Sequence, residues 1–381
     1  MPPRQPKGFR VQSRKSPMSR HRRSSPAVPL ERATASDSPP FPPSWLDRLE
    51  AWIEGRRVPV WAVYLVIAIG LSLLLHLPLW SDRSVPLGTL DVNQLTAADF
   101  PVYFFGLIHY LNSTARKALA SYRPLLDLGD QEYASLEYTL THVPRRLGVL
   151  ALLLGVFFGP LSFFSSPADW GVKPTFSILS QATLLFTALV MYVAVVYWTI
   201  QVVRQARTID RIHKMTKRLD IFRRDPVYSF SSLTLRSALG PLLAAYSYIF
   251  IALYLGLAAV PTTVDWAIMG AAVAIALAIF FLPLNRMHSL LAAEKQHVLR
   301  EMDDRYSRLL ERFNRQLDTG RYGALNSTST AITALSAQRD VAARVSTWPW
   351  KPETLRSLLS TLALPVILYL LSRLLGRLLG V

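Results

Sequence analysis

The chain of 381 residues contains no cysteine, which excludes disulfide bonds, thiolate nucleophiles, iron–sulfur clusters and thiolate zinc sites. Its seven histidines are scattered and form no H-E-x-x-H pattern, so we expect no bound metal. Phosphate-loop, dinucleotide-binding, serine-hydrolase and kinase signatures are also missing. We therefore predict that the protein is not an enzyme and carries no cofactor.

Acidic residues are scarce, since 25 Asp and Glu stand against 42 Lys and Arg and give a formal net charge of +17. Eight basic residues precede the first acid, Glu31, in a tail (1–43) whose Pro, Ser and Arg content predicts disorder. A basic tail beside apolar segments indicates a cytoplasmic N-terminus that attracts anionic lipid headgroups. Nucleic acid is disfavoured as a partner, because no aromatic or motif support accompanies the charge.

Long apolar stretches dominate the rest of the chain. Stretches 147–164, 176–203, 239–260 and 264–284 contain no charged residue apart from Asp265 at one margin. About 20 apolar residues in a helix cross a hydrocarbon layer of roughly 30 Å, and only helices or closed barrels satisfy their backbone there. The sequence therefore predicts an all-α fold, a polytopic transmembrane helical bundle in the cell membrane.

The predicted number of crossings is six or seven. Two further spans, 58–80 and a last helix with the apolar run 358–372, bring the total to six. Basic residues after position 203 place the end of stretch 176–203 in the cytoplasm. Only three crossings precede that point, and an odd number of crossings cannot start from an N-terminus on the same side of the membrane. We therefore predict a short or buried seventh crossing around the aromatic run 100–111, with an extension to Leu119 left open. Six spans with the basic tail outside the cell are the alternative.

Amphipathic segments flank the predicted bundle, 58–284. Residues 44–57 predict a helix with Ser44 as N-cap and Asp47 as its N3 partner, and its two tryptophans, Trp45 and Trp52, favour the membrane surface. A linker helix packed on the protein is the alternative. Residues 285–351 predict a cytoplasmic helical hairpin, and 352–381 predict a C-terminal membrane helix. An apolar stripe in the hairpin has coiled-coil spacing and predicts cytoplasmic association into a homo-oligomer. Its residues are Met302, Tyr306, Leu309 and Phe313.

Small residues recur within the spans. Gly155 and Gly159 form a G-x-x-x-G pattern, and Gly270 and Ala274 belong to a second series of small residues four positions apart. Small side chains let helices approach closely where lipid supplies no hydrophobic drive. We predict that these residues pack helices together, either between subunits or within one chain.

The last helix carries a few polar residues. Arg373 and Arg377 are four positions apart and share one face, and Ser360 and Thr361 lie upstream. Long basic side chains near a helix end can extend to the membrane interface at little cost. The pattern is therefore compatible with simple interfacial anchoring, with a helix lying flat, or with a solute or anion pathway lined by these four residues.

Three parts of the chain are distinctive: I-H-Y-L at 108–111 with Y-R-P at 122–124, I-F-R-R-D-P-V-Y-S-F-S-S-L-T at 221–234, and T-W-P-W at 347–350. Together they resemble a group of uncharacterised bacterial multi-span proteins. That resemblance implies membership and no activity. Separately, seven spans with a cytoplasmic N-terminus and helices prolonged into the cytosol are similar to the plan of insect odorant and gustatory receptor channels, a likeness of architecture without shared motifs.

These observations favour a multi-pass membrane protein without a catalytic motif. We predict a structural or sensory membrane assembly in the plasma membrane, with membrane lipid and further copies of itself as partners. A ligand-gated or passive ion channel is the alternative function. A carrier coupled to protons or sodium is not expected, because the apolar runs lack the carboxylates that such coupling requires.

Overall fold

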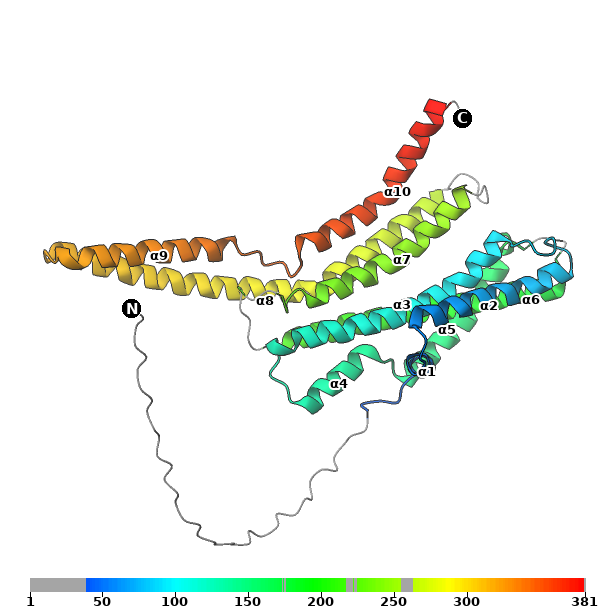
Figure 1. Ribbon diagram of the computed structural model, residues 1–381, viewed down its shortest axis with the longest axis horizontal. Helices are drawn as coiled ribbons and strands as arrows, with labels where there is room; N and C mark the ends of the chain where they lie inside the picture. Colours follow the sequence, from blue (N-terminus) through cyan, green and yellow to red (C-terminus); the bar gives the residue numbers. More distant parts are fainter. Residues whose placement is uncertain are drawn as a thin grey trace, which may run out of the picture. The chain divides into compact units, whose positions relative to one another are not determined.

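The structure is a computed structural model that describes residues 39–172, 174, 176–216, 222, 225–254 and 263–379. Within these ranges the fold is entirely helical, apart from two isolated β-bridges (Figure 1). The helices in chain order are α1 (Trp45–Glu54), α2 (Val60–Ser81), α3 (Val92–Tyr122), η1 (Arg123–Leu125), α4 (Asp130–Thr141), α5 (Arg145–Ser165), η2 (Pro167–Trp170), α6 (Ile178–Lys214), α7 (Ser229–Tyr254), α8 (Thr263–Asp318), η3 (Tyr322–Ala324), α9 (Leu325–Arg344) and α10 (Pro352–Leu379).

Four helices of the described part are long and apolar enough to cross a membrane. They are α2, α5, α6 and the portion of α8 from Gly270 onward. Most of their apolar side chains are not buried inside the chain, since no more than a third of each apolar window is covered. Large apolar side chains that point away from the protein interior suit a lipid environment. The fold is therefore an all-α bundle with four candidate membrane-spanning helices.

Helix α3 lies at the centre of the bundle and packs against α2, α6 and α7 (Figure 1). The sequence predicts only a short apolar run at 100–111, whereas the observed helix has 31 residues and begins after Asp91, whose side chain caps Gln94. The polar residues Asn112 and Thr114 lower its hydropathy, yet both are buried against neighbouring helices. The helix is longer than its apolar pattern because its polar side chains face protein.

Helices α5 and α6 pack closely through the two glycines of the G-x-x-x-G pattern. A Cβ atom at Gly155 would lie 2.3 Å from Val193 Cγ2, and one at Gly159 would lie 2.7 Å from the Cα of Leu189. The backbones of the two helices therefore touch within one chain. Gly270 differs, because a Cβ atom there would meet nothing within 4 Å.

Helix α8 continues for 56 residues without a break, so the predicted span 264–284 and the first arm of the predicted hairpin belong to one helix. Pro283 lies inside the helix and does not end it. The helix ends before Gly320, whose φ of 69° is a left-handed conformation that favours glycine. Helix α9 then folds back along α8 (Figure 1).

The α8–α9 hairpin is held by polar contacts as well as by its apolar stripe. Arg339 Nε donates to Asp303 Oδ1 at 2.6 Å, and Thr328 Oγ1 donates to Gln316 Oε1 at 2.9 Å. Lys295 Nζ donates to the Ala343 carbonyl at 2.6 Å. The predicted association residues lie at helical spacing between Lys295 and Gln316 and are half-buried, so they share the face of α8 that α9 covers. These residues are Met302, Tyr306, Leu309 and Phe313.

The T-W-P-W segment connects α9 to α10 and packs on α8. The Trp348 ring stacks on His288 with centroids 3.8 Å apart, and His288 Nδ1 lies 3.1 Å from the Thr347 carbonyl oxygen. The Trp350 ring contacts Phe280 at 5.6 Å and Phe281 at 5.5 Å between centroids. The two tryptophans therefore fix the start of α10 to the middle of α8.

Candidate functional site

The candidate site is built around α1, which begins with a capping box as the sequence predicts. The Ser44 amide and hydroxyl both donate to Asp47 Oδ2 at 2.8 Å. The Val143 amide donates to the same carboxylate at 3.2 Å, and Ser44 Oγ lies 2.6 Å from the Tyr197 hydroxyl. The capping box therefore also ties α1 to the α4–α5 connection and to α6.

One face of α1 is acidic and points into the protein. Asp47, Glu50 and Glu54 are spaced by three and four residues, so they share a face, and Asp47 and Glu50 are each only 6% exposed. Trp52, which belongs to the predicted membrane-facing side, is 53% exposed. The side of α1 that meets the protein is therefore partly charged.

Glu50 is held by a buried amide network. Its Oε2 accepts from Asn112 Nδ2 at 3.0 Å, while Asn112 Oδ1 accepts from the amides of Gln201 at 2.6 Å and Gln205 at 3.1 Å. Its second oxygen, Oε1, has no hydrogen-bond partner among the described residues. Burial raises the pKa of Glu50 to about 8, assisted by the charges of Asp47 and Glu54 and opposed by the Asn112 hydrogen bond. This carboxyl group therefore carries a proton near neutral pH.

Glu54 lies one turn further along α1 in a different environment. Its Oε1 accepts from Arg116 at 2.8 Å and lies 3.2 Å from His109 Nε2. Partial burial acts to raise the pKa of Glu54, but the hydrogen bond and charge of Arg116 outweigh it, so the pKa lies below its usual value. The acidic face thus combines a neutral carboxyl group with an ionised one.

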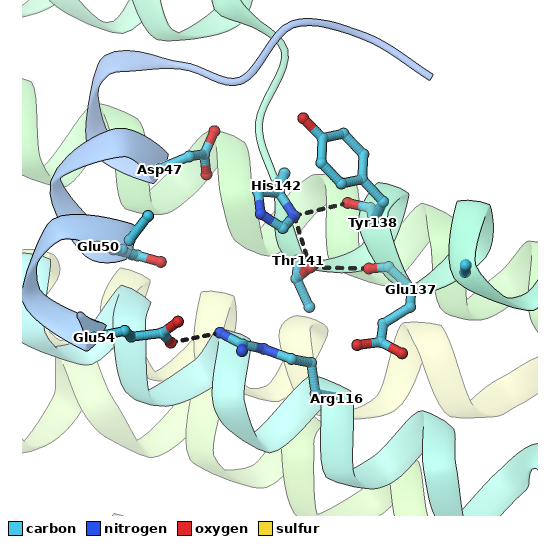
Figure 2. A pocket seen from close by; sticks show the side chains of 10 residues that line it. Asp47, Glu50, Glu54, Arg116, Glu137, Tyr138, Thr141 and His142 are labelled. Carbon is cyan, nitrogen blue, oxygen red and sulfur yellow. Dashed lines mark hydrogen bonds and ion pairs between the residues drawn. The ribbon is translucent and has the colours of Figure 1, made fainter. Parts of the chain in front are cut away.

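A cavity of about 260 Å³ opens in front of this face (Figure 2). Figure 2 shows Asp47, Glu50 and Glu54 on one side of the cavity and Arg116, Thr141 and His142 opposite them. Glu137 of α4 adds a fourth carboxyl group to the lining. Burial lowers the pKa of His142, so its ring is neutral at pH 7 and Arg116 supplies the positive charge. Carboxyl groups therefore outnumber the basic group in this cavity.

A second, larger hollow of about 1040 Å³ lies between α2, α3 and α7 and shares Glu54 with the first. Its lining is mainly apolar and includes Trp61, Leu65 and Leu243. Several polar contacts that cross or border it join helices. They include Ser72 Oγ to Asp99 Oδ1 at 3.1 Å, Tyr103 Oη to the Gly240 carbonyl at 2.7 Å and Arg236 Nη1 to Thr114 Oγ1 at 3.1 Å.

The residues predicted as a pathway are not brought together with this site. The hydroxyls of Ser360 and Thr361 both donate to the Ser357 carbonyl, at 3.1 and 2.9 Å, so they bond to their own helix. The side chains of Arg373 and Arg377 lie outside the described residues. Among the helix-packing residues, Gly155 and Gly159 meet α6, whereas Gly270 and Ala274 are exposed. No cluster of metal-ligating side chains occurs in the described part of the chain.

The acidic face and its amide network are absent from the sequence predictions. The sequence contains only a weak signal for them. Three acids have helical spacing in segment 44–57, where the tryptophans decided the interpretation, and two glutamines lie at the end of an apolar run. Asn112, which joins the two, is separated from Glu50 by 62 residues. A single sequence offers no rule that pairs such distant polar residues.

Comparison with protein families, with curated proteins and with solved structures finds no match to this chain.

Proposed function

We propose that the chain is a multi-span membrane protein with a structural or sensory role and no catalytic activity. The observation that carries the proposal is the unbroken helix α8. Its first part is apolar and packs with α7, and its charged second part is covered by α9. A rigid helix that joins a membrane bundle to a charged hairpin suits a protein that links the membrane to an assembly or a partner. In the proposal the hairpin lies in the cytoplasm.

We propose seven crossings, formed by α2, α3, α5, α6, α7, α8 and α10. The 31 residues of α3 span about 46 Å at roughly 1.5 Å per residue, which exceeds the roughly 30 Å of a hydrocarbon core. It packs against α2, α6 and α7, and its polar residues Asn112 and Thr114 are buried, as a helix with polar residues in lipid requires. The basic residues near the end of α6 favour the cytoplasm for that end, in the plasma membrane, with anionic lipid beside the basic flanks.

The topology predicts how a single cysteine responds to an impermeant reagent. Because the chain has no cysteine, Arg20→Cys introduces the only thiol. With seven crossings residue 20 lies inside, so labelling in intact cells should be weak and should become strong after the cells are permeabilised. Strong labelling of intact cells would favour six spans with the tail outside.

The proposed assembly role predicts that the hairpin is needed for oligomers. Lys295 Nζ donates to the carbonyls of Ala343 and Val345, so the ends of segment 296–345 lie close together and a short Gly-Ser linker can replace it. Deleting 296–345 should abolish the oligomers that crosslinking detects in membranes, while the protein stays in the membrane. Undiminished crosslinking would contradict the role.

The control for this deletion keeps the hairpin and weakens one contact. Asp303→Asn removes the ion pair with Arg339, in which both side chains are about half exposed. Exposed ion pairs contribute at most about 1 kcal/mol. The Asp303→Asn protein should therefore crosslink as the unmodified protein does.

A channel is the second function that we retain, with Ser360, Thr361, Arg373 and Arg377 along its pathway. Planar bilayers with purified protein would then conduct, and Arg373→Ala would change the ion selectivity. We also propose that the chain belongs to the group of uncharacterised bacterial multi-span proteins that it resembles. Such membership favours neither the structural or sensory role nor the channel.

A further inference from the structure

The cavity beneath α1 contains a polar atom that the fold leaves unsatisfied. Glu50 lines the cavity and is 6% exposed, yet its Oε1 has no hydrogen-bond partner in the described part of the chain. An unpartnered polar atom in a buried position is costly, and native structures normally satisfy it. Because Oε2 accepts from Asn112, the proton of the neutral carboxyl group lies on Oε1. Once Glu50 loses that proton, Oε1 calls for a hydrogen-bond donor that does not belong to the described residues.

The charged residues around the cavity favour a positively charged hydrogen-bond donor. Asp47, Glu54 and Glu137 line the cavity together with Glu50. Arg116 donates to Glu54 through Nη2, while its Nε has no partner among the described residues. Both Asp47 oxygens are occupied, since they accept from Ser44 and Val143. An anion would meet net repulsion here, whereas a positively charged N–H group would meet attraction and, once Glu50 has lost its proton, a free acceptor.

We propose that this cavity binds a primary ammonium group, which donates an N–H to Glu50 Oε1 and lies between the carboxyl groups of Glu50 and Glu137. A quaternary ammonium group has no N–H and cannot satisfy the free oxygen. The volume of about 260 Å³ is below the roughly 300 Å³ at which pockets hold drug-sized ligands, so it suits a small amine or a headgroup. The site adds a ligand to the proposed function and does not depend on it.

The ammonium group can come from two sources. One is a free amine in the aqueous phase, such as ethanolamine. The other is the headgroup of phosphatidylethanolamine, because α1 ends six residues before the candidate span α2 and the cavity therefore lies near a membrane surface. Both sources present the same chemistry to Glu50.

Binding should be linked to the proton on Glu50. The groups around it come from five helices and the α4–α5 connection. They are Asp47 and Glu54 on α1, Tyr64 on α2, Asn112 and Arg116 on α3, Glu137 on α4, Tyr197 on α6 and the neutral His142. With a pKa of about 8, Glu50 is protonated at pH 7 in the empty cavity, and an ammonium group favours its ionised form. Binding at pH 7 should therefore release close to one proton.

Calorimetry tests the site on the full chain in phosphatidylcholine nanodiscs, titrated with ethanolamine in two buffers of different ionisation enthalpy. We expect saturable binding with close to one proton released per ethanolamine. Glu50→Gln should weaken binding roughly 30-fold or more, as expected when one partner of a buried charged hydrogen bond is removed, and should abolish proton release. Glu132→Gln, which changes an exposed acid of α4 outside the cavity, should leave both unchanged.

A second measurement distinguishes the free amine from the lipid headgroup. It uses the unmodified protein, so it remains informative if the Glu50→Gln protein does not fold. If the headgroup is the ligand, replacing part of the phosphatidylcholine by phosphatidylethanolamine should raise the unfolding temperature of the unmodified protein and weaken ethanolamine binding. If a free amine is the ligand, the lipid change should have no effect. The proposal is wrong if ethanolamine binds without proton release, or if neither amine source has an effect that requires Glu50. Proton release by the unmodified protein is decisive should the Glu50→Gln protein not fold.

Discussion

Replacing Gly155 and Gly159 together by alanine should destabilise the protein by about 2–6 kcal/mol, which is about 1–3 kcal/mol for each overpacked site. The Cβ atom at Gly155 would lie 2.7 Å from the backbone N and Cα of Val193, and the one at Gly159 would lie 2.7 Å from the Cα of Leu189. Backbone atoms cannot rotate away as a side chain can, so α5 and α6 must separate. Their separation would also loosen every other contact along this pair.

The measurement is the midpoint of thermal unfolding in detergent, followed by tryptophan fluorescence. Gly70→Ala and Gly270→Ala are matched controls, because a Cβ atom at either glycine meets nothing within 4 Å. There alanine should be neutral or slightly stabilising, since glycine costs up to about 1 kcal/mol in a helix. Equal losses at all four glycines would contradict the proposed α5–α6 contact.

Glu50→Gln should remove much of the decrease in stability that the protein shows as pH rises. The folded pKa of about 8 lies above the usual value of 4.5, so between these values the folded state holds a proton that the unfolded state has lost. Stability therefore falls as pH rises through this window and levels off above the folded pKa. From about pH 6 to about pH 9 this single group contributes a loss of roughly 2–3 kcal/mol.

Glutamine is close in shape to glutamic acid, and its carbonyl can still accept the Asn112 hydrogen bond. The variant should therefore unfold at nearly the same temperature as the unmodified protein near pH 6 and at a higher temperature near pH 9. Unfolding curves in detergent across this pH range measure the difference. Glu132→Gln serves again as the exposed control, and parallel pH profiles for the Glu50→Gln and unmodified proteins would contradict the assigned burial of Glu50.

The sequence predicts the apolar helices well because their signal is local. The run 147–164 corresponds to α5 and the run 58–80 to α2, each within two residues. The capping box at Ser44 is likewise confirmed, because all of its parts lie within four consecutive residues. Each of these features depends on one segment alone, and neighbouring helices do not alter it.

The sequence predicts the structure poorly where a residue's role depends on contacts with distant parts of the chain. The aromatic run 100–111 underestimates α3, because the polar residues beyond it lower the hydropathy. One of them, Asn112, joins Glu50 to the α6 glutamines in the structure. The change from an apolar to an amphipathic pattern after position 284 does not show that α8 is one continuous helix, with Pro283 inside it. Helix α4, which supplies Glu137 to the acidic cavity, has no apolar run that would have indicated it.

Alkaline carbonate extraction of membranes that contain the full chain tests the central claim most directly, namely that the apolar helices span a lipid bilayer. The exposed apolar surfaces of α2, α5, α6 and α8 predict that the protein stays in the membrane pellet at high pH and is released only by detergent. Release by carbonate into the supernatant, as a monodisperse monomer without detergent, would contradict the account.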